Sequence, residues 1–280
     1  MSWPRSRPVA GGIQIAYRRR VDQLAASLSA LPEWQWASLL GVLGAIIGSF
    51  IAVLVIRWPQ DRSVLAGRSH CDACDAVLGP VDLVPLLSAL AMRGRCRHCA
   101  APIDPLHWQI ELAALAIGVS AGALIVGPTA IAVALFGWLL LALAALDITD
   151  FWLPDRLTLT LALAGIATGY IGIAPPLMDR LIGGVGGFAA LWAIAAGYKA
   201  YRGQEGLGGG DPKLLGAIGL WLGWQMLPVV VLLAGMIGLG VALFWMLSGR
   251  GVRRDDRLPF GALLAVAAYP AAIAMLMMPL

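Results

Sequence analysis

Two aspartates, Asp147 and Asp211, lie at the ends of apolar segments, where ionisable side chains are rare and costly. Asp147 ends the run LLLALAALD, and Asp211 follows three glycines in EGLGGGDPKLLG. Two carboxylates that share a proton can hydrolyse a peptide bond: the ionised acid takes a proton from water, and the protonated acid hydrogen-bonds the scissile carbonyl. Helix dipoles favour the base role for Asp211, at a helix N-terminus, and the acid role for Asp147, near a C-terminus.

The glycines before Asp211 carry no side chains, so an extended peptide or a neighbouring helix could approach the backbone at Gly208 and Gly210. The competing interpretation is structural, with Asp211 as the N-cap of the helix that follows. Asp155 is likewise predicted to be an N-cap, with Asp150 in the turn before it. The residues around Asp211 alone do not decide between catalysis and capping.

All four cysteines form two CxxC pairs, Cys71 with Cys74 and Cys96 with Cys99. Paired CxxC motifs place four thiolates around one tetrahedral ion, so the spacing predicts a structural zinc site. A complete four-cysteine shell leaves no open position for water, and the metal is expected to fold the loop rather than do chemistry. Disulfides and a redox CxxC are the alternatives; a reducing compartment disfavours the first and the paired spacing disfavours the second.

The composition of the chain indicates that these residues lie on or between membrane-spanning helices. The chain has 280 residues, of which 60% are hydrophobic and 13% charged, and it therefore belongs in a membrane. A span needs about 20 mostly apolar residues. We predict an all-α polytopic membrane protein with eight spans, at about 38–57, 109–127, 129–147, 157–174, 180–198, 212–227, 229–247 and 260–278.

Lysines and arginines gather after the first, third, fifth and seventh spans, and the positive-inside rule assigns these loops to the cytoplasm. The opposite loops contain one basic residue, Arg180. The cysteine loop and both aspartates then face the cytoplasm. Residues 13–31 could form an interfacial amphipathic helix. The predicted parts are an N-terminal tail (1–37), the first span (38–57), a cysteine loop (58–108) and a seven-helix membrane domain (109–280).

Together these residues resemble the type IV prepilin peptidase family. The matching motifs cover most of the chain in order: GSF (48–50), the CxxC pairs with PLLS (85–88) and RGRC (93–96), QIEL with Glu111, Asp147 with LPD (153–155), GGGD (208–211) and LPFG (258–261). The resemblance implies a peptidase of the bacterial inner membrane with Asp147 and Asp211 as its catalytic aspartates. Its implied substrates are prepilins or pseudopilins, whose basic leader is cut at the cytoplasmic face, in pilus assembly or type II secretion.

The resemblance also implies, for many members, methylation of the new N-terminus with S-adenosylmethionine. Two departures lie in the half of the protein linked with this activity, because Ala52 and Leu83 stand where the family usually has asparagine. Glu111 is retained as the candidate acid for methyl transfer, although a glutamate at the edge of a span could equally be an interfacial anchor. The expected partners are prepilins or pseudopilins and membrane lipid, and no nucleic acid.

The alternative function is a membrane scaffold whose cysteine loop docks a partner and whose aspartates only cap helices. Such a scaffold should tolerate Asp211→Asn, because asparagine caps helices about as well as aspartate. A transporter is disfavoured, since the centres of the predicted spans hold almost no polar residue besides glycine.

Overall fold

The computed structural model describes residues 31–64, 69–71, 73–125, 127–204, 206–249 and 258–278. Within these ranges the regular elements are helices, which confirms the predicted all-α fold class. The interfacial helix predicted for 13–31 falls almost entirely outside the described residues, and so does the basic loop 250–257.

The long helices are α2 (Glu33–Arg57), α4 (Pro105–Leu124), α5 (Pro128–Asp150), α6 (Asp155–Tyr170), α7 (Leu177–Arg202), α8 (Asp211–Leu247) and α9 (Phe260–Met277); a short helix, α3 (Leu87–Ala91), lies in the cysteine loop. The predicted spans overlap these long helices, with the sixth and seventh both in α8. Five described helices, α2 and α5 together with α7, α8 and α9, are long and apolar enough to cross a membrane. The count of eight spans remains a prediction.

Helix α8 is broken at Gly223, whose φ of 71° and ψ of 175° are not helical. Leu215 and Leu227, on either side of the break, both approach Gly187 of α7. A straight helix would hold these two leucines about 18 Å apart along its axis, so the chain changes direction at the break. The sequence predicted the boundary at Pro228 instead; glycine adopts a positive φ without a steric penalty, and Pro228 lies inside the second half.

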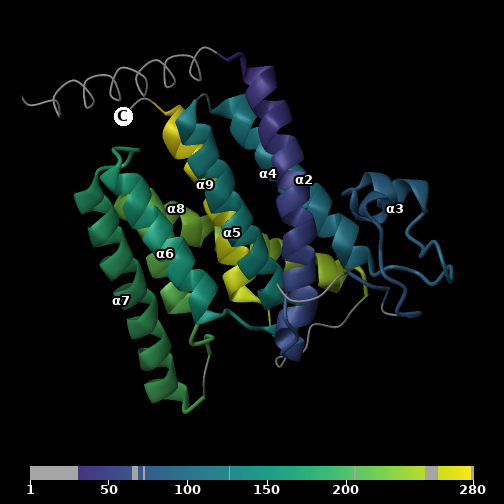
Figure 1. Cartoon of the computed structure of the whole chain (residues 1–280). Coiled ribbons are helices and arrows are strands. Elements are labelled where there is room, and N and C mark those ends of the chain that lie inside the picture. Colours follow the sequence, from purple (N-terminus) through teal and green to yellow (C-terminus); the bar gives the residue numbers. More distant parts are fainter. Residues whose placement is uncertain are drawn as a thin grey trace, which may run out of the picture.

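Helices α5 and α9 pack together at the centre of the bundle (Figure 1). Helices α2 and α4 lie on one side of them, with the cysteine loop projecting outward, and α6 and α7 lie on the other side. Helix α8 begins beside α6 and α7, and its second half passes behind α9 toward the side of α2. One apolar core joins α2, α4 and α5 around Ala114 and Leu146. The other joins α5 through α9 around Ile218 and Ala268. Since α5 belongs to both cores, it connects the two halves of the molecule.

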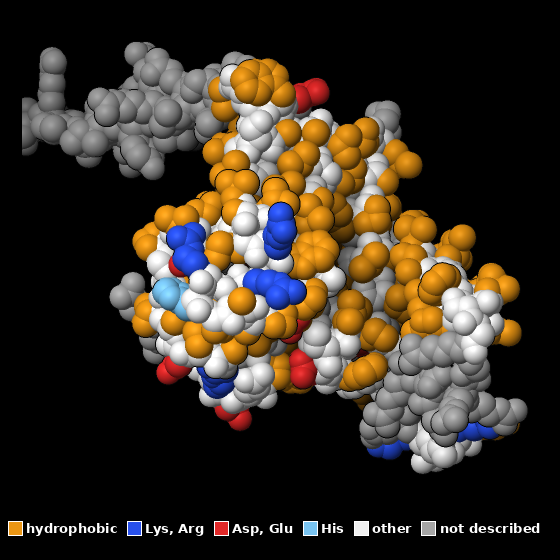
Figure 2. Space-filling model, turned by 90° about the vertical axis from the view of Figure 1, so that its right-hand side faces the viewer, with side chains coloured by type: hydrophobic (Ala, Val, Ile, Leu, Met, Phe, Trp, Pro, Cys, Tyr) orange, Lys and Arg blue, Asp and Glu red, His pale blue; other side chains and the backbone are white. Residues whose placement is uncertain are grey.

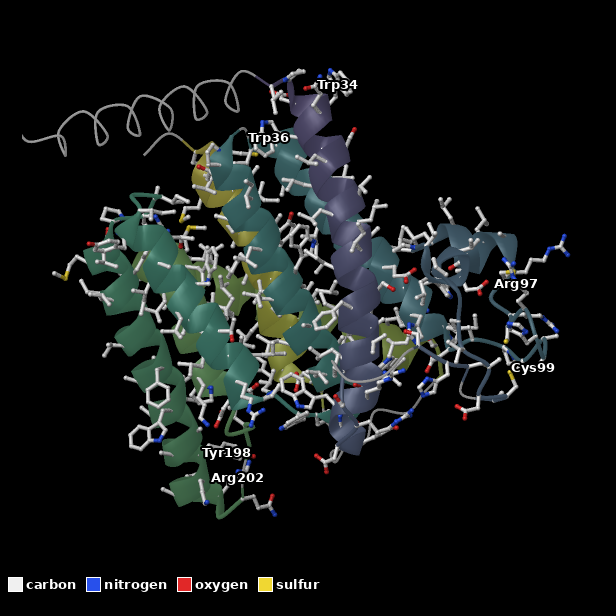
Figure 3. All side chains as sticks on the ribbon, viewed as in Figure 1. Trp34, Trp36, Arg97, Cys99, Tyr198 and Arg202 are labelled. Atoms are coloured by element: carbon white, nitrogen blue, oxygen red, sulfur yellow. The ribbon has the colours of Figure 1, made fainter. Side chains whose placement is uncertain are left out.

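The residues predicted to do chemistry lie toward one end of the bundle. Asp147 lies in the last turn of α5, and α6, α8 and α9 begin beside it. Arg202, which ends α7, lies at this end, whereas Trp34 and Trp36 lie at the other (Figure 3). In Figure 2 the flank beside the cysteine loop is largely hydrophobic, and charged side chains gather on the loop and along the lower edge. This distribution suits a bundle whose flanks meet lipid.

Arg180 lies near the start of α7 and is 1% exposed. Its guanidinium bonds to Thr168 Oγ1 and to the backbone carbonyls of five residues, Gly165, Ile173, Ala174, Pro175 and Leu220. The sequence indicated only a charge in an outer loop. In the structure this charge joins the end of α6, the turn before α7 and the first half of α8.

Candidate active site and metal centre

Asp147 is 6% exposed and is held by the start of another helix. Its Oδ2 accepts a hydrogen bond of 2.7 Å from the backbone N–H of Ala262, in the first turn of α9. A helix N-terminus binds a carboxylate well, because it offers unpaired N–H groups and the positive end of the helix dipole. The dipole of α5 alone predicted the acid role for Asp147. The positive end of the α9 dipole also faces Asp147 and favours its ionised form, against the effect of α5. Helix dipoles therefore do not decide which aspartate is the acid and which is the base.

Asp211 is 4% exposed and is the first residue of α8. Its Oδ2 accepts a hydrogen bond of 3.0 Å from the N–H of Gly208, in the glycine loop before the helix. The N-cap position belongs to Gly210. The prediction that Asp211 is an N-cap is therefore wrong by one residue, because its carboxylate is turned back toward the loop.

The carboxylates of Asp147 and Asp211 lie side by side against Gly261, the second residue of α9. A Cβ atom built on this glycine would lie 3.0 Å from Asp147 Oδ2 and 3.1 Å from Asp211 Oδ1. The two oxygens are therefore no farther apart than the sum of these distances. A side chain at this position would press on both acids, and glycine lets α9 begin against them.

Leu153, from the LPD motif, packs between the glycine loop and α9. A Cβ atom at Gly210 would lie 2.7 Å from Leu153 Cβ, and one at Gly261 would lie 2.7 Å from Leu153 Cδ1. At Gly210, where a peptide or a helix was predicted to approach the backbone, the side chain of Leu153 in the same chain makes the close contact. The backbone N–H of Gly208 donates a hydrogen bond to Asp211 Oδ2. Sequence reasoning missed Leu153, Gly261 and the Ala262 N–H; the available signals were the LPD and LPFG motifs themselves.

Asp155 joins the starts of α6 and α8. Lys213 Nζ lies 2.7 Å from Asp155 Oδ1, two residues after Asp211. Asp155 is the first residue of α6, whose N-cap is Pro154 without a side-chain bond, so the N-cap prediction for Asp155 is wrong. Asp150 is the last residue of α5 rather than part of the turn. Both acids are exposed, which leaves Asp147 and Asp211 as the buried pair at this end.

The four cysteines come together as predicted. Their sulfur atoms all lie within 4.8 Å of one another, and Cys71 Sγ is 3.8 Å from Cys99 Sγ. A tetrahedral ion with metal–sulfur bonds of about 2.3 Å holds its sulfurs about 3.8 Å apart. The cluster could therefore hold a metal ion.

Each CxxC pair lies on the same kind of backbone turn. The first cysteine of each pair exchanges hydrogen bonds across the turn, Cys71 with Asp75 and Ala76, and Cys96 with Ala100 and Ala101. Single antiparallel bridges close the two turns, His70 with Val77 and Arg95 with Pro102. The N–H groups of Cys99 and His98 lower the pKa of the Cys96 thiol to about 6. This favours the thiolate, which is the form that binds a metal.

Glu111, on α4, is 7% exposed and joins the cysteine loop to the membrane helices. Its Oε2 accepts a hydrogen bond of 2.8 Å from the N–H of Leu86. An interfacial anchor would be exposed, so that interpretation does not fit. Glu111 also lines a cavity of about 360 Å³. Of the two departures from the family pattern, Leu83 lines this cavity, whereas Ala52 is fully buried in α2 and does not.

Sequence comparisons place this architecture among known proteins. Residues 42–124 match the bacterial peptidase A24 N-terminal domain, and residues 134–243 match the type IV leader peptidase family. A prepilin leader peptidase/N-methyltransferase of Burkholderia pseudomallei (strain K96243) is 40% identical over 267 residues, which cover 86% of each chain. The chain belongs to the type IV leader peptidase family.

Other members of the type IV leader peptidase family have the same name. Those of Aeromonas hydrophila and Pectobacterium carotovorum subsp. carotovorum are both 35% identical, over 263 and 272 residues. These matches cover 84% and 88% of this chain and 90% and 95% of the relatives. No solved structure matches the chain. Membership confirms the resemblance read from the motifs, and with the apolar helices it identifies a multi-pass membrane peptidase.

Proposed function

We propose that this chain is an aspartic endopeptidase that removes the leader peptide of prepilins or pseudopilins, with Asp147 and Asp211 as its catalytic residues. The observation that carries the proposal is the convergence of two buried carboxylates, from α5 and α8, beside Gly261. The name shared by the relatives, prepilin leader peptidase, supplies the substrate class. A scaffold would have no need to bury two acids against each other, because burying a carboxylate is costly.

In the proposed reaction, one aspartate is ionised and takes a proton from a water molecule, whose oxygen attacks the scissile carbonyl carbon. The other aspartate is protonated and hydrogen-bonds the carbonyl oxygen, where negative charge develops. The tetrahedral intermediate collapses as the carbon–nitrogen bond breaks, and the leaving nitrogen receives the proton that came from water. The N–H groups of Gly208 and Ala262 hold the two carboxylates in position for these transfers.

We also propose that the cysteine cluster holds a structural zinc ion. Four thiolates from two CxxC turns are the usual shell of structural zinc, and the sulfur separations fit its bond lengths. Because the cysteines would fill all four positions, the ion would stabilise the loop and leave peptide hydrolysis to the aspartates. The excess of basic residues in the loops at this end supports an orientation with the site facing the cytoplasm, in the inner membrane.

The second proposed activity is N-methylation of the N-terminus that cleavage exposes, with S-adenosylmethionine as the donor. The relatives carry the name N-methyltransferase, and Glu111 is buried at a cavity in the half of the chain that matches the N-terminal domain of the family. When bound, S-adenosylmethionine supplies a methyl group attached to a cationic sulfur.

The test is co-expression with a prepilin from the same organism, followed by the intact mass of the pilin. Wild type and the exposed control Asp150→Asn should remove the leader, whereas Asp147→Asn and Asp211→Asn should lose activity by on the order of 1,000-fold or more. A product heavier by one methyl group would support the second activity. Leader removal by both buried-aspartate variants would overturn the aspartic mechanism and leave the two aspartates a structural role, as acceptors for the N–H groups of Ala262 and Gly208.

A further inference from the structure

Residues 80–91 of the cysteine loop, PVDLVPLLSALA, are almost entirely apolar and end with helix α3. Several of their side chains point away from the rest of the protein. Val81 and Leu87 are each 66% exposed, and Leu90 is 77% exposed. Exposed apolar surface gathered in one short segment marks a contact with another molecule or with a membrane.

The segment lies beside the apolar part of α2 rather than beyond its end. Leu86 donates its N–H to Glu111 of α4, and a Cβ atom on Gly48 of α2 would lie 2.8 Å from Glu111 Cα. Gly48 is nine positions before Arg57, the last residue of α2, which is about 13 Å along the helix axis. Figure 1 likewise shows α3 level with the middle of α2. Helix α3 is therefore level with the membrane-spanning part of α2.

The helices beside the segment expose apolar side chains at the same level. Phe50 on α2 is 48% exposed and Leu112 on α4 is 49% exposed, close in the chain to Gly48 and Glu111. Because α2 is long and apolar enough to cross a membrane, side chains at this level face the acyl chains of the lipid. Lipid is therefore the medium that surrounds the bundle where the segment lies.

Basic residues follow the apolar segment directly. Arg93, Arg95 and Arg97 are all exposed, and Arg97 pairs at 3.1 Å with Asp82, the one charged residue of the segment. In Figure 2, basic side chains lie among hydrophobic ones on the upper part of the loop, and most acidic ones lie lower. Apolar side chains next to arginines match a bilayer with anionic lipids, since the acyl chains take the first and the phosphates bind the second.

We propose that residues 80–91 are inserted in the adjoining leaflet of the membrane and bind anionic lipid. Leu87 and Leu90 contact the acyl chains, and Arg93 and Arg95 contact the lipid phosphates. The segment is shorter than the about 20 residues of a span, so it enters one leaflet and returns. The proposal is independent of the peptidase activity, because it depends only on the position and the surface of the cysteine loop.

Insertion would also hold the cysteine loop against the bundle. The bond between Leu86 and Glu111 is the hydrogen bond that joins α4 to the start of α3. Lipid around α3 keeps water away from this bond, and a hydrogen bond is stronger where the local dielectric constant is low. The metal-binding turns that flank the segment would then keep a fixed position relative to α2 and α4.

The experiment measures the depth of a nitroxide label in the purified full-length protein, reconstituted in vesicles of phosphatidylcholine and phosphatidylglycerol. The label is attached through p-acetylphenylalanine, which leaves the four cysteines free to bind metal. In Leu90→p-acetylphenylalanine, oxygen should relax the nitroxide more than a water-soluble nickel chelate does, because oxygen concentrates among acyl chains. His98→p-acetylphenylalanine, an exposed control on the same loop, should show the reverse. Leu112→p-acetylphenylalanine gives the value for a lipid-facing side chain.

A second arm of the experiment varies the charge of the lipid. Vesicles of phosphatidylcholine alone should hold the Leu90 label at a shallower depth than vesicles that contain phosphatidylglycerol. The double variant Arg93→Gln with Arg95→Gln should lose this difference, whereas the exposed control Arg156→Gln should keep it. A depth that never changes with the charge of the lipid would overturn the assignment of anionic lipid.

The remaining outcomes separate lipid from other occupants. A Leu90 label as accessible to nickel as the His98 label would place the segment in water and overturn the proposal. Shielding from both oxygen and nickel would indicate a protein contact, such as a second copy of the chain, and would also overturn it. Circular dichroism and leader cleavage report folding, and a label at Leu87 replaces one at Leu90 that prevents it. Failure of the unlabelled protein to cleave prepilin would count against the peptidase proposal alone.

Discussion

The backbone N–H of Ala262 lies 2.7 Å from Oδ2 of Asp147, a residue 115 positions earlier in the chain. This bond makes the start of α9 part of the site, although the two aspartates come from α5 and α8. Gly261 allows α9 to come this close. Three helices must therefore meet before the two acids are in place.

The first prediction concerns Gly261→Ala. The added methyl group would lie 3.0 Å and 3.1 Å from the two carboxylate oxygens, so the acids must shift. We expect the initial rate of leader removal to fall by about tenfold or more, because small displacements of catalytic groups are costly. The control is Gly240→Ala, where no atom lies within 4 Å of the added carbon. A wild-type rate for Gly261→Ala would show that the acids need no such close approach.

The second prediction concerns the cysteine cluster. Cys96→Ser should lose the bound metal, measured by elemental analysis of the purified protein, and the loop should become sensitive to proteolysis. His98→Gln, an exposed neighbour, should keep the metal because four cysteines complete the shell. Full metal content in Cys96→Ser would contradict a four-cysteine site.

Acidification should release the same metal. Protons compete with a metal ion for thiolates, and the pKa of Cys96 is lowered to about 6 by backbone N–H groups. Because protons and the metal compete for all four thiolates, metal content should fall progressively as the pH is lowered. Metal content is measured after dialysis at a series of pH values. Retention at pH 4 would indicate that thiolates are not the ligands.

The fourth prediction concerns Arg180, which supplies hydrogen bonds to five backbone carbonyls. Arg180→Gln leaves most of these buried acceptors without a donor, and we expect a loss of about 3–5 kcal/mol in the free energy of unfolding. Arg156→Gln, at an exposed position of α6, should change it by about 0.5 kcal/mol or less. Thermal unfolding in detergent compares the two variants. Equal Tm values would show that the hydrogen bonds of Arg180 do not stabilise the fold.

Gly223→Ala tests the break in α8. Alanine at a φ of 71° and a ψ of 175° should cost about 1–3 kcal/mol, and its methyl group would meet Gln225 Oε1 at 3.0 Å. The matched control is Gly235→Ala, which adds a methyl group in open space within the second half of α8. A lower Tm for Gly223→Ala alone is expected. Two unchanged Tm values would mean that the chain can turn without glycine.

The helices and the cysteine cluster were predictable because their signals are local. Apolar length predicts where a helix lies, and two CxxC turns place four thiolates together. Cap positions were predicted less well. Asp155 pairs with Lys213 and Asp211 bonds to Gly208, and these contacts replaced the capping bonds that residue type alone indicated.

The surroundings of the aspartates could not be predicted, because they depend on contacts between distant segments. The LPFG motif marks out Gly261, but its residues do not indicate that two carboxylates from other helices will lie beside it. The same is true of Arg180, whose partners lie on α6, α8 and the preceding turn. The positive-inside rule uses such an arginine only to assign a loop to one side of the membrane. It cannot show which groups the guanidinium bonds to.

The hydrogen bond between Leu86 and Glu111 bears on how the protein is made. All four cysteines come before α4 in the chain, and Glu111 lies within α4. Because synthesis proceeds from the N-terminus, the ribosome releases the cysteine loop before α4, so all four thiols are available before Glu111 is. Leu86 can meet Glu111 only after the first turns of α4 have been synthesised. The cysteine loop can therefore dock on α4 only after both segments exist, and the cavity that Glu111 lines is closed only once they have met.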